Sequence, residues 1–201
     1  MSAGSRADPE AFRRLDLEAH RLLAGVPLHD VWRVDLPGGG PGRSLADVRS
    51  LLAFESVART NPAVRFLFRL RGWLGTLFRW DAAGSEPAAA DARSFLARVP
   101  DSLRRRSDPE PGSQDGPFTL LYALEREAVS EVRNATVHAF SVLALEPGAE
   151  GYRLHWAIYV APVGRFTGLY MALIDPFRRL LIYPAVLRHL RRAWASAYGG
   201  P

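Results

Sequence analysis

The chain has 201 residues, a length that fits one domain, and 48% of them are hydrophobic, which is ample for a packed core. It has no cysteine, which excludes disulfides, thiolate metal sites and a cysteine nucleophile. All 26 basic residues are arginine, and the net charge of +5 permits anionic partners without requiring them. Without a signal-peptide pattern or a long apolar run, the expectation is a cytoplasmic protein.

The first half of the chain begins with helical signals. Asp8-Pro9 is a helix start, and Gly25 ends the apolar stripe that follows it. The alternating stretch 26–36 predicts a strand, and the glycine-rich stretch 37–42 predicts a loop. Ser44, with Asp47 three positions later, predicts a capped helix.

The stretch RFLFRLRGWLGTLFRW, residues 65–80, combines five aromatic rings with four arginines. On a helical wheel Arg65, Arg69 and Arg79 share one stripe, and apolar side chains fill much of the remainder. This predicts a surface helix packed on its own domain. Binding to a membrane surface or to nucleic acid stays open as an alternative interpretation of the same pattern.

The middle of the chain, 82–117, predicts a short helix at 88–99 and a solvated loop at 104–117 that includes an arginine triplet. Four strand-like stretches follow at 118–124, 128–132, 136–145 and 152–162, and their short connections predict an antiparallel meander. From 164 onward the pattern is helical. Pro176 and Pro184 predict that this long helix is kinked or divided.

The stretches NATVHAF, AIYVAPVGRFTGLYMALIDPFRRLLIYP and FRLRGWLGTLFRWD resemble a bacterial family of uncharacterised SRPBCC-like (START-like, helix-grip) proteins. The resemblance covers roughly 28–80 and 117–195. It implies an α+β helix-grip fold, in which a curved antiparallel sheet wraps around a long C-terminal helix with a cavity between them. Residues 1–27 would then be a helical extension of a single domain spanning 28–201. It carries over no catalytic residues, and arginine follows Asp175-Pro176-Phe177 where many relatives have histidine.

Motifs for metal, nucleotide or hydrolase chemistry are missing from the sequence. The five histidines form no H-x-x-x-H or H-E-x-x-H pattern, so neither a metal site nor a cofactor is predicted. There is no G-x-S-x-G elbow and no phosphate-binding loop, and the glycines at 38–42 lack the dinucleotide spacing.

The last hairpin carries the candidate site. If the turn at 146–151 pairs Leu145 with Tyr152, His138 lies opposite Tyr159, and both share one face with His155. The other face is more apolar and is expected to meet the C-terminal helix, leaving the two histidines on the wetter, convex side. A slip of one residue would instead place His138 and Tyr159 in the cavity as an acid/base pair.

Two sets of residues are therefore candidates. The catalytic candidates are His138, Tyr159 and, at a pocket rim, Glu131. The ligand-binding candidates are aromatic or small polar residues of the meander and the final helix: Tyr122, Ser141, Tyr152, His155, Trp156, Tyr170 and Tyr183.

The leading functional hypothesis is a protein that holds a small apolar molecule between sheet and helix, and that acts as a polyketide cyclase or dehydratase if it is an enzyme. A second is a carrier or sensor without catalysis. A third is a peripheral membrane protein that uses Arg188, Arg191 and Arg192 with the basic stripe described above. No nucleic-acid partner is predicted, and the oligomeric state stays open.

Overall fold

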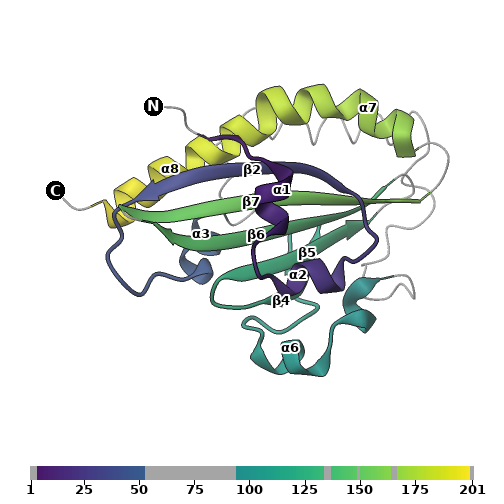
Figure 1. Ribbon diagram of the computed structural model, residues 1–201, viewed down its shortest axis with the longest axis horizontal. Coiled ribbons are helices and arrows are strands. Elements are labelled where there is room, and N and C mark those ends of the chain that lie inside the picture. Colours follow the sequence, from purple (N-terminus) through teal and green to yellow (C-terminus); the bar gives the residue numbers. More distant parts are fainter. Residues whose placement is uncertain (1–3, 53–93, 134–136, 149, 164–166, 200–201) are drawn as a thin grey trace.

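The computed structural model describes residues 4–52, 94–133, 137–148, 150–163 and 167–199. Its centre is a seven-stranded sheet in the order β1-β2-β7-β6-β5-β4-β3, and every neighbouring pair is antiparallel. The fold class is α+β, as the sequence predicts, with helices on both faces of the sheet (Figure 1). The strands are β1 (Ser5–Arg6), β2 (Leu28–Pro37), β3 (Gln114–Asp115), β4 (Phe118–Ala123), β5 (Glu127–Arg133), β6 (Val137–Gly148) and β7 (Gly151–Pro162).

One face of the sheet, here the α2 face, is covered by the short helices α1 (Pro9–Arg13), α2 (Glu18–Leu22), η3 (Phe95–Arg98) and α6 (Asp101–Arg106). Asp8 caps α1 by accepting backbone N–H groups, and proline follows it, as predicted. Phe12 and Leu23 are buried against the sheet. The arginine triplet 104–106 forms the last turn of α6, so its assignment to a loop was wrong.

The opposite face, the α8 face, packs on α3 (Leu45–Leu51) and on α8 (Tyr183–Tyr198). The capping box at Ser44 and Asp47 is present, as the sequence predicts. Leu187, Leu190 and Trp194 of α8 are buried in one cluster with β2, β6 and β7. The prediction that the more apolar face of the last hairpin meets the C-terminal helix is therefore confirmed.

The C-terminal helical region runs from Thr167 to Tyr198 in three consecutive pieces: α7 (Thr167–Phe177), the π-helical η4 (Arg178–Ile182) and α8. Pro176 lies inside α7, and Pro184 is at the start of α8, so the two prolines flank the π turn. Proline has no N–H for the helical ladder, and a widened turn accommodates its loss. The predicted division near both prolines is confirmed.

Two parts of the prediction lie outside the described residues: the helix at 65–80, and the part of 88–99 before Ser94. None of the described helices combines the length and the apolar character needed to cross a membrane.

Candidate functional site

The last hairpin has a different register from the predicted one. Leu145 pairs with Leu154, His138 with Ala161 and Phe140 with Tyr159, so the direct pairing of His138 with Tyr159 was wrong. The ladder continues to the pair Gly148 and Gly151, three residues further along β6 and one residue further along β7 than the sequence suggested. Because the shift is two residues, every side chain keeps its predicted face.

Gly151 explains why the ladder can continue that far. Its φ is +144°, and a Cβ on it would lie 2.4 Å from the carbonyl oxygen of Leu36 on the neighbouring strand. Only glycine tolerates both the backbone conformation and the close approach. The sequence shows the glycine but not the neighbour that requires it.

The predicted site residues are divided between the two faces. Glu131, His138, Tyr159, Tyr122 and His155 belong to the α2 face. Ser141, Tyr152, Trp156 and Tyr183 belong to the α8 face or its helix. The side chain of Tyr170, on α7, lies outside the described part of the chain. The candidates therefore cannot form one site.

The α2 face is dry, contrary to the expectation of a wetter, convex side. Val129, Phe140 and Val142 are fully buried, and His138 and His155 are only 5% and 8% exposed. The physical reason is the cover supplied by α1, α2 and η3, whose apolar residues pack across this face. The polar groups beneath them need partners within the protein.

Glu131 and His138 satisfy each other under that cover. His138 Nε2 lies 2.8 Å from Glu131 Oε2, and the Glu131 side chain is 0% exposed. The same carboxylate accepts the Ser94 hydroxyl, and also the Phe95 backbone N–H at 3.1 Å. Glu131 therefore fastens the start of η3 to the sheet, and all its partners belong to the protein.

Glu127, four residues earlier on β5, repeats this arrangement at α2. Its carboxylate accepts the backbone N–H of Glu18 at 3.0 Å and lies 3.5 Å from that of Ala19. Burial raises the pKa of Glu127, and the two N–H groups oppose that rise. Two acidic side chains of one strand thus hold the two helical segments that cover the α2 face.

Tyr159 pairs with the N-terminal helices and not with His138. Its hydroxyl lies 3.2 Å from Nδ1 of His20, whose Nε2 is 3.2 Å from the carbonyl oxygen of Phe12. Burial raises the pKa of Tyr159 and also that of Tyr122. The Tyr122 hydroxyl is buried without a hydrogen-bond partner in the described chain.

His155 lies on the α2 face beside Phe12, with ring centroids 6.2 Å apart. Its Nε2 is 2.7 Å from Glu146 Oε2, whereas its Nδ1 is buried without a partner among the described residues. Burial lowers the pKa of His155, and Glu146 only partly offsets this. The folded protein thus resists protonation of this ring.

We therefore expect His155 to make the fold less stable in acid. In the unfolded chain the His155 ring takes up a proton at the ordinary histidine pKa of about 6.5, which is above its pKa in the folded protein. The contribution of the neutral ring to the free energy of unfolding is therefore complete above about pH 6.5, and it is lost as pH falls through the folded pKa. Urea unfolding between about pH 7 and pH 5 measures the loss, which His155→Gln should reduce. His189→Gln on α8 is the control, and an equal effect of both variants would contradict the assignment.

The α8 face differs from the α2 face because its centre is not sealed. Its central side chains on β5, β6 and β7 are half-buried: Ser130, Val132, Ala139, Ser141, Leu143 and Trp156. By contrast, Val129, Glu131, Phe140, Val142 and Ala157 beside them on the α2 face are buried. The half-buried residues are mainly apolar and contiguous across three strands. They form a partly exposed, mainly apolar surface on the α8 face.

An aromatic cluster borders this surface. Trp32 and Trp156 are directly paired on β2 and β7, and each ring lies 5.1 Å from that of Tyr183 on α8. The Tyr183 hydroxyl accepts a hydrogen bond from Arg178, while burial, the larger effect, raises the Tyr183 pKa to about 12. The cluster can contact flat apolar groups.

Polar groups are few on the α8 face. Ser130 and Ser141 are directly opposite each other on β5 and β6, and the Ser141 hydroxyl oxygen accepts from Trp156 Nε1 at 2.9 Å. Trp32 is 7% exposed, and its Nε1 is a buried donor without an acceptor in the described chain. Sequence analysis missed Trp32 and Ser130. The pairing of Ser130 with Ser141 could have been inferred from the short stretch of sequence between the two predicted strands.

Tyr152 lies toward the end of the face near the glycine-rich loop. Its hydroxyl accepts from the Arg43 backbone N–H at 3.0 Å and donates to the Gly40 carbonyl at 2.9 Å. Its ring packs edge-on against Trp194, with centroids 5.7 Å apart. Tyr152 therefore holds the glycine-rich loop against α8.

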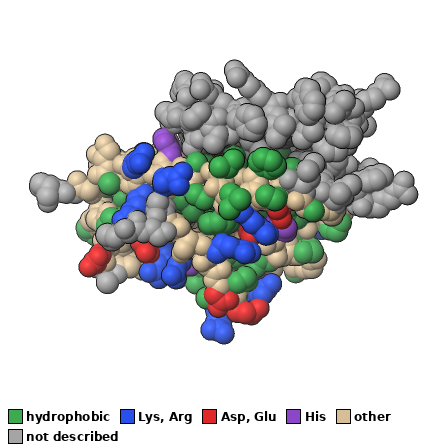
Figure 2. Space-filling model, turned by 90° about the horizontal axis from the view of Figure 1, so that it is seen from above, with side chains coloured by type: hydrophobic (Ala, Val, Ile, Leu, Met, Phe, Trp, Pro, Cys, Tyr) green, Lys and Arg blue, Asp and Glu red, His purple; other side chains and the backbone are tan. Residues whose placement is uncertain are grey.

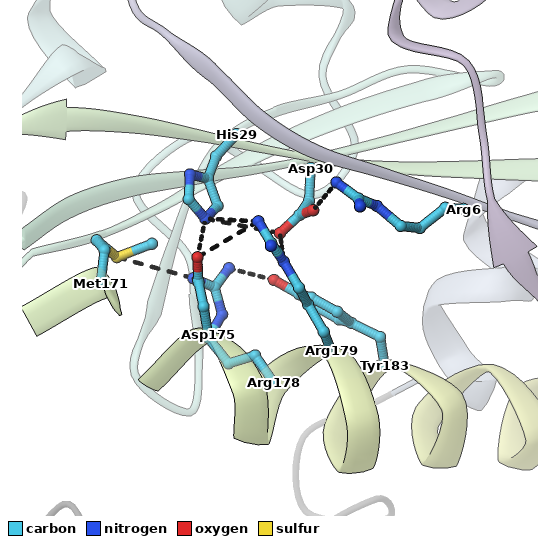
Figure 3. A network of polar contacts seen from close by, with 8 residues as sticks. All are labelled: Arg6, His29, Asp30, Met171, Asp175, Arg178, Arg179 and Tyr183. Carbon is cyan, nitrogen blue, oxygen red and sulfur yellow. Dashed lines mark hydrogen bonds and ion pairs between the residues drawn. The ribbon is translucent and has the colours of Figure 1, made fainter. Parts of the chain in front are cut away.

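A polar network lies where the beginning of β2 meets α7 and η4 (Figure 3). The β2–β7 register shifts between Leu28 and Asp30, and His29 stands at this bulge. His29 Nε2 is 2.7 Å from Asp175 Oδ2, and Asp30 bonds Arg6 at 3.1 Å and Arg179 at 3.2 Å. The network ties β1, β2 and the C-terminal helices together.

Three atoms of this network could ligate a metal ion: His29 Nε2 and one carboxylate oxygen each of Asp30 and Asp175, all within 4.8 Å of one another. Arg179 already lies among them, with Nη2 at 3.3 Å from Asp175 and Nε at 3.2 Å from Asp30. A bound cation would have to displace that guanidinium, so the arrangement fits an ion-pair network better. Sequence analysis missed it because His29 and Asp175 are 146 residues apart.

Comparison with known proteins identifies a family whose function is unknown. A search of curated proteins gave no match. The model of the family described as "Protein of unknown function (DUF2867)" matches residues 22–185. The match begins at the end of α2, ends in the first turn of α8, and includes β2 to β7. The chain therefore belongs to the DUF2867 family.

Proposed function

We propose that the protein binds a small apolar molecule on the α8 face, between the sheet and the C-terminal helical region. The observation that carries this proposal is the unequal burial of the two faces: Ser141, Leu143 and Trp156 are half-buried, whereas Phe140, Val142 and Ala157 beside them are 0% exposed. Apolar side chains with a few polar groups among them are typical of small-molecule sites.

The ligand that suits this face is flat or aliphatic and carries a hydrogen-bond acceptor, such as a carbonyl or ether oxygen. Trp32 Nε1 is a buried donor without a described acceptor, and an unpaired buried donor costs about 1–3 kcal/mol. Ser141 accepts from Trp156, so its own hydroxyl proton remains to be donated. An acceptor on the ligand beside Ser141 would take this hydroxyl proton.

Binding without turnover suits the geometry better than a cyclase or dehydratase reaction. His138 and Glu131 pair under the helices of the α2 face, and Tyr159 pairs with His20 there. The sheet separates these acid/base groups from the proposed surface. The proposal is therefore a carrier or sensor, and the order of sheet and C-terminal helix supports a helix-grip, START-like architecture for it.

Filling the surface should weaken binding strongly. Ala139→Phe places a ring in the half-buried centre of the α8 face, and we expect it to weaken binding of the apolar probe 1-anilinonaphthalene-8-sulfonate at least about tenfold. Fluorescence titration of the folded protein measures the dissociation constant, and circular dichroism checks that the variant remains folded.

Ala161→Phe is the matched control. Ala161 is also half-buried, lies on the strand next to Ala139, and points to the α2 face. It should leave the dissociation constant of the probe unchanged. Equal weakening by both variants, or none by Ala139→Phe, contradicts the proposed surface.

A further inference from the structure

Large hydrophobic side chains are exposed at one place in the described chain. Phe177, Leu180 and Leu181 are 39%, 75% and 46% exposed, and they lie at the junction of α7 and the π turn η4. Scattered single exposed leucines need no explanation, but three within five residues form a patch. The inner side of the same region is occupied, because Met171 and Tyr183 are buried.

From the patch to the C-terminal end of the sequence, the side-chain charge has a single sign. Residues 176–201 contain five arginines and no aspartate or glutamate. Arg178 and Arg179 are engaged with Asp175 at 3.2 and 3.3 Å. Further along α8, Arg188 and Arg192 are exposed and form no ion pair with any described residue. Figure 2, seen from above, shows hydrophobic side chains gathered together with arginines on both sides.

These residues share the outer side of one continuous helical region. Phe177, Leu181, Arg188 and Arg192 follow one another at whole-turn steps, and Leu180 adjoins them. We call Phe177, Leu180, Leu181, Arg188 and Arg192 the π-turn surface. Exposed apolar side chains and arginines are the two kinds of group that interfacial helices use, because the apolar groups enter the lipid and the basic groups meet anionic headgroups.

We propose that the π-turn surface binds an anionic lipid bilayer. The two leucines and the phenylalanine enter the boundary between headgroups and acyl chains, and the arginines contact the lipid phosphates. A nucleic acid would use the arginines but leave exposed leucines without a role. A bilayer uses both. Residues 176–201 contain no acidic side chain, and the nearby carboxylates of Asp175 and Asp30 are paired with arginines.

Vesicle flotation tests this interaction with the full-length chain. The wild type is expected to float with vesicles of phosphatidylcholine and phosphatidylglycerol, and much less with phosphatidylcholine alone. Each arginine near an anionic surface contributes a factor of about five, so Arg188→Gln with Arg192→Gln should weaken binding roughly 25-fold. Leu180→Ser with Leu181→Ser should weaken it at least about tenfold, because two exposed apolar side chains are lost.

The control is Arg105→Gln with Arg106→Gln, which removes the same charge from exposed positions on α6 at the far side of the molecule (Figure 1). It should bind like the wild type. Equal losses in both arginine pairs would show an effect of net charge alone and overturn the proposal. Unchanged vesicle binding by the Leu180→Ser, Leu181→Ser variant would overturn it too. A third contradicting result is a wild-type dimer that this variant converts to a monomer, with neither protein binding vesicles.

Discussion

Glu131→Ala is expected to lower the free energy of unfolding by about 3–5 kcal/mol, because it leaves several buried groups without their acceptor. Glu131 is 0% exposed and accepts from Ser94, from the Phe95 backbone and from His138. Its removal also frees the start of η3 from the sheet. Urea unfolding followed by circular dichroism measures the loss.

Glu131→Gln is the matched control for this role. The amide keeps an oxygen for the Phe95 N–H, and its NH₂ can donate to the Ser94 oxygen, which leaves the cover of the α2 face in place. We expect most of the stability to be retained. If Glu131→Ala unfolds within about 1 kcal/mol of the wild type, the carboxylate does not hold η3 and the account of the α2 face is wrong.

Trp194→Ala is the second large effect, with an expected loss of about 3–5 kcal/mol. Trp194 is fully buried, packs edge-on against Tyr198 with centroids 4.8 Å apart, and donates from Nε1 to the Pro37 carbonyl at 3.2 Å. Gly39 has a φ of +91°, and a Cβ there would lie 2.9 Å from the indole. The alanine variant leaves a cavity between α8 and the end of β2.

Trp194→Phe separates packing from the hydrogen bond. It retains a ring for Tyr152 and Tyr198 but loses the donor to Pro37, so we expect a smaller loss than for alanine. In Trp194→Ala the hydrogen-exchange rate of the α8 amides should rise more than that of the β6 amides. Unchanged exchange in α8 would contradict the view that Trp194 docks this helix.

The local signals in the sequence predicted most of the described fold. The caps at Asp8 and Ser44, the meander and the division of the last helix near its prolines depend on neighbouring residues, and a sequence displays those directly. The faces of the last hairpin also followed from alternation. The register of the hairpin could not be predicted in this way. The β6–β7 ladder extends to Gly151, which packs against the Leu36 backbone on β2, and the local sequence does not show that contact.

What sequence patterns could not supply is the pairing of distant groups. From the sequence, Glu131 is predicted to lie at a pocket rim. Its burial becomes evident only from its hydrogen bonds with Ser94 and Phe95, which are 37 and 36 residues away in the sequence. The sequence near His138 and His155 favours a solvent-exposed face, because it gives no sign of the distant helices around Phe12 that cover them. Such contacts depend on long-range packing, and alternation along a strand carries no information about it.

The most direct measurement of the proposed function is native mass spectrometry of the freshly purified wild type beside Ala139→Phe, followed by denaturing extraction. We expect an additional small apolar molecule of defined mass on the wild type, which is lost on denaturation. It should be missing from Ala139→Phe and retained by Ala161→Phe. A wild-type mass equal to that of the chain alone, together with no stabilisation by 1-anilinonaphthalene-8-sulfonate or other apolar probes, would contradict ligand binding on the α8 face.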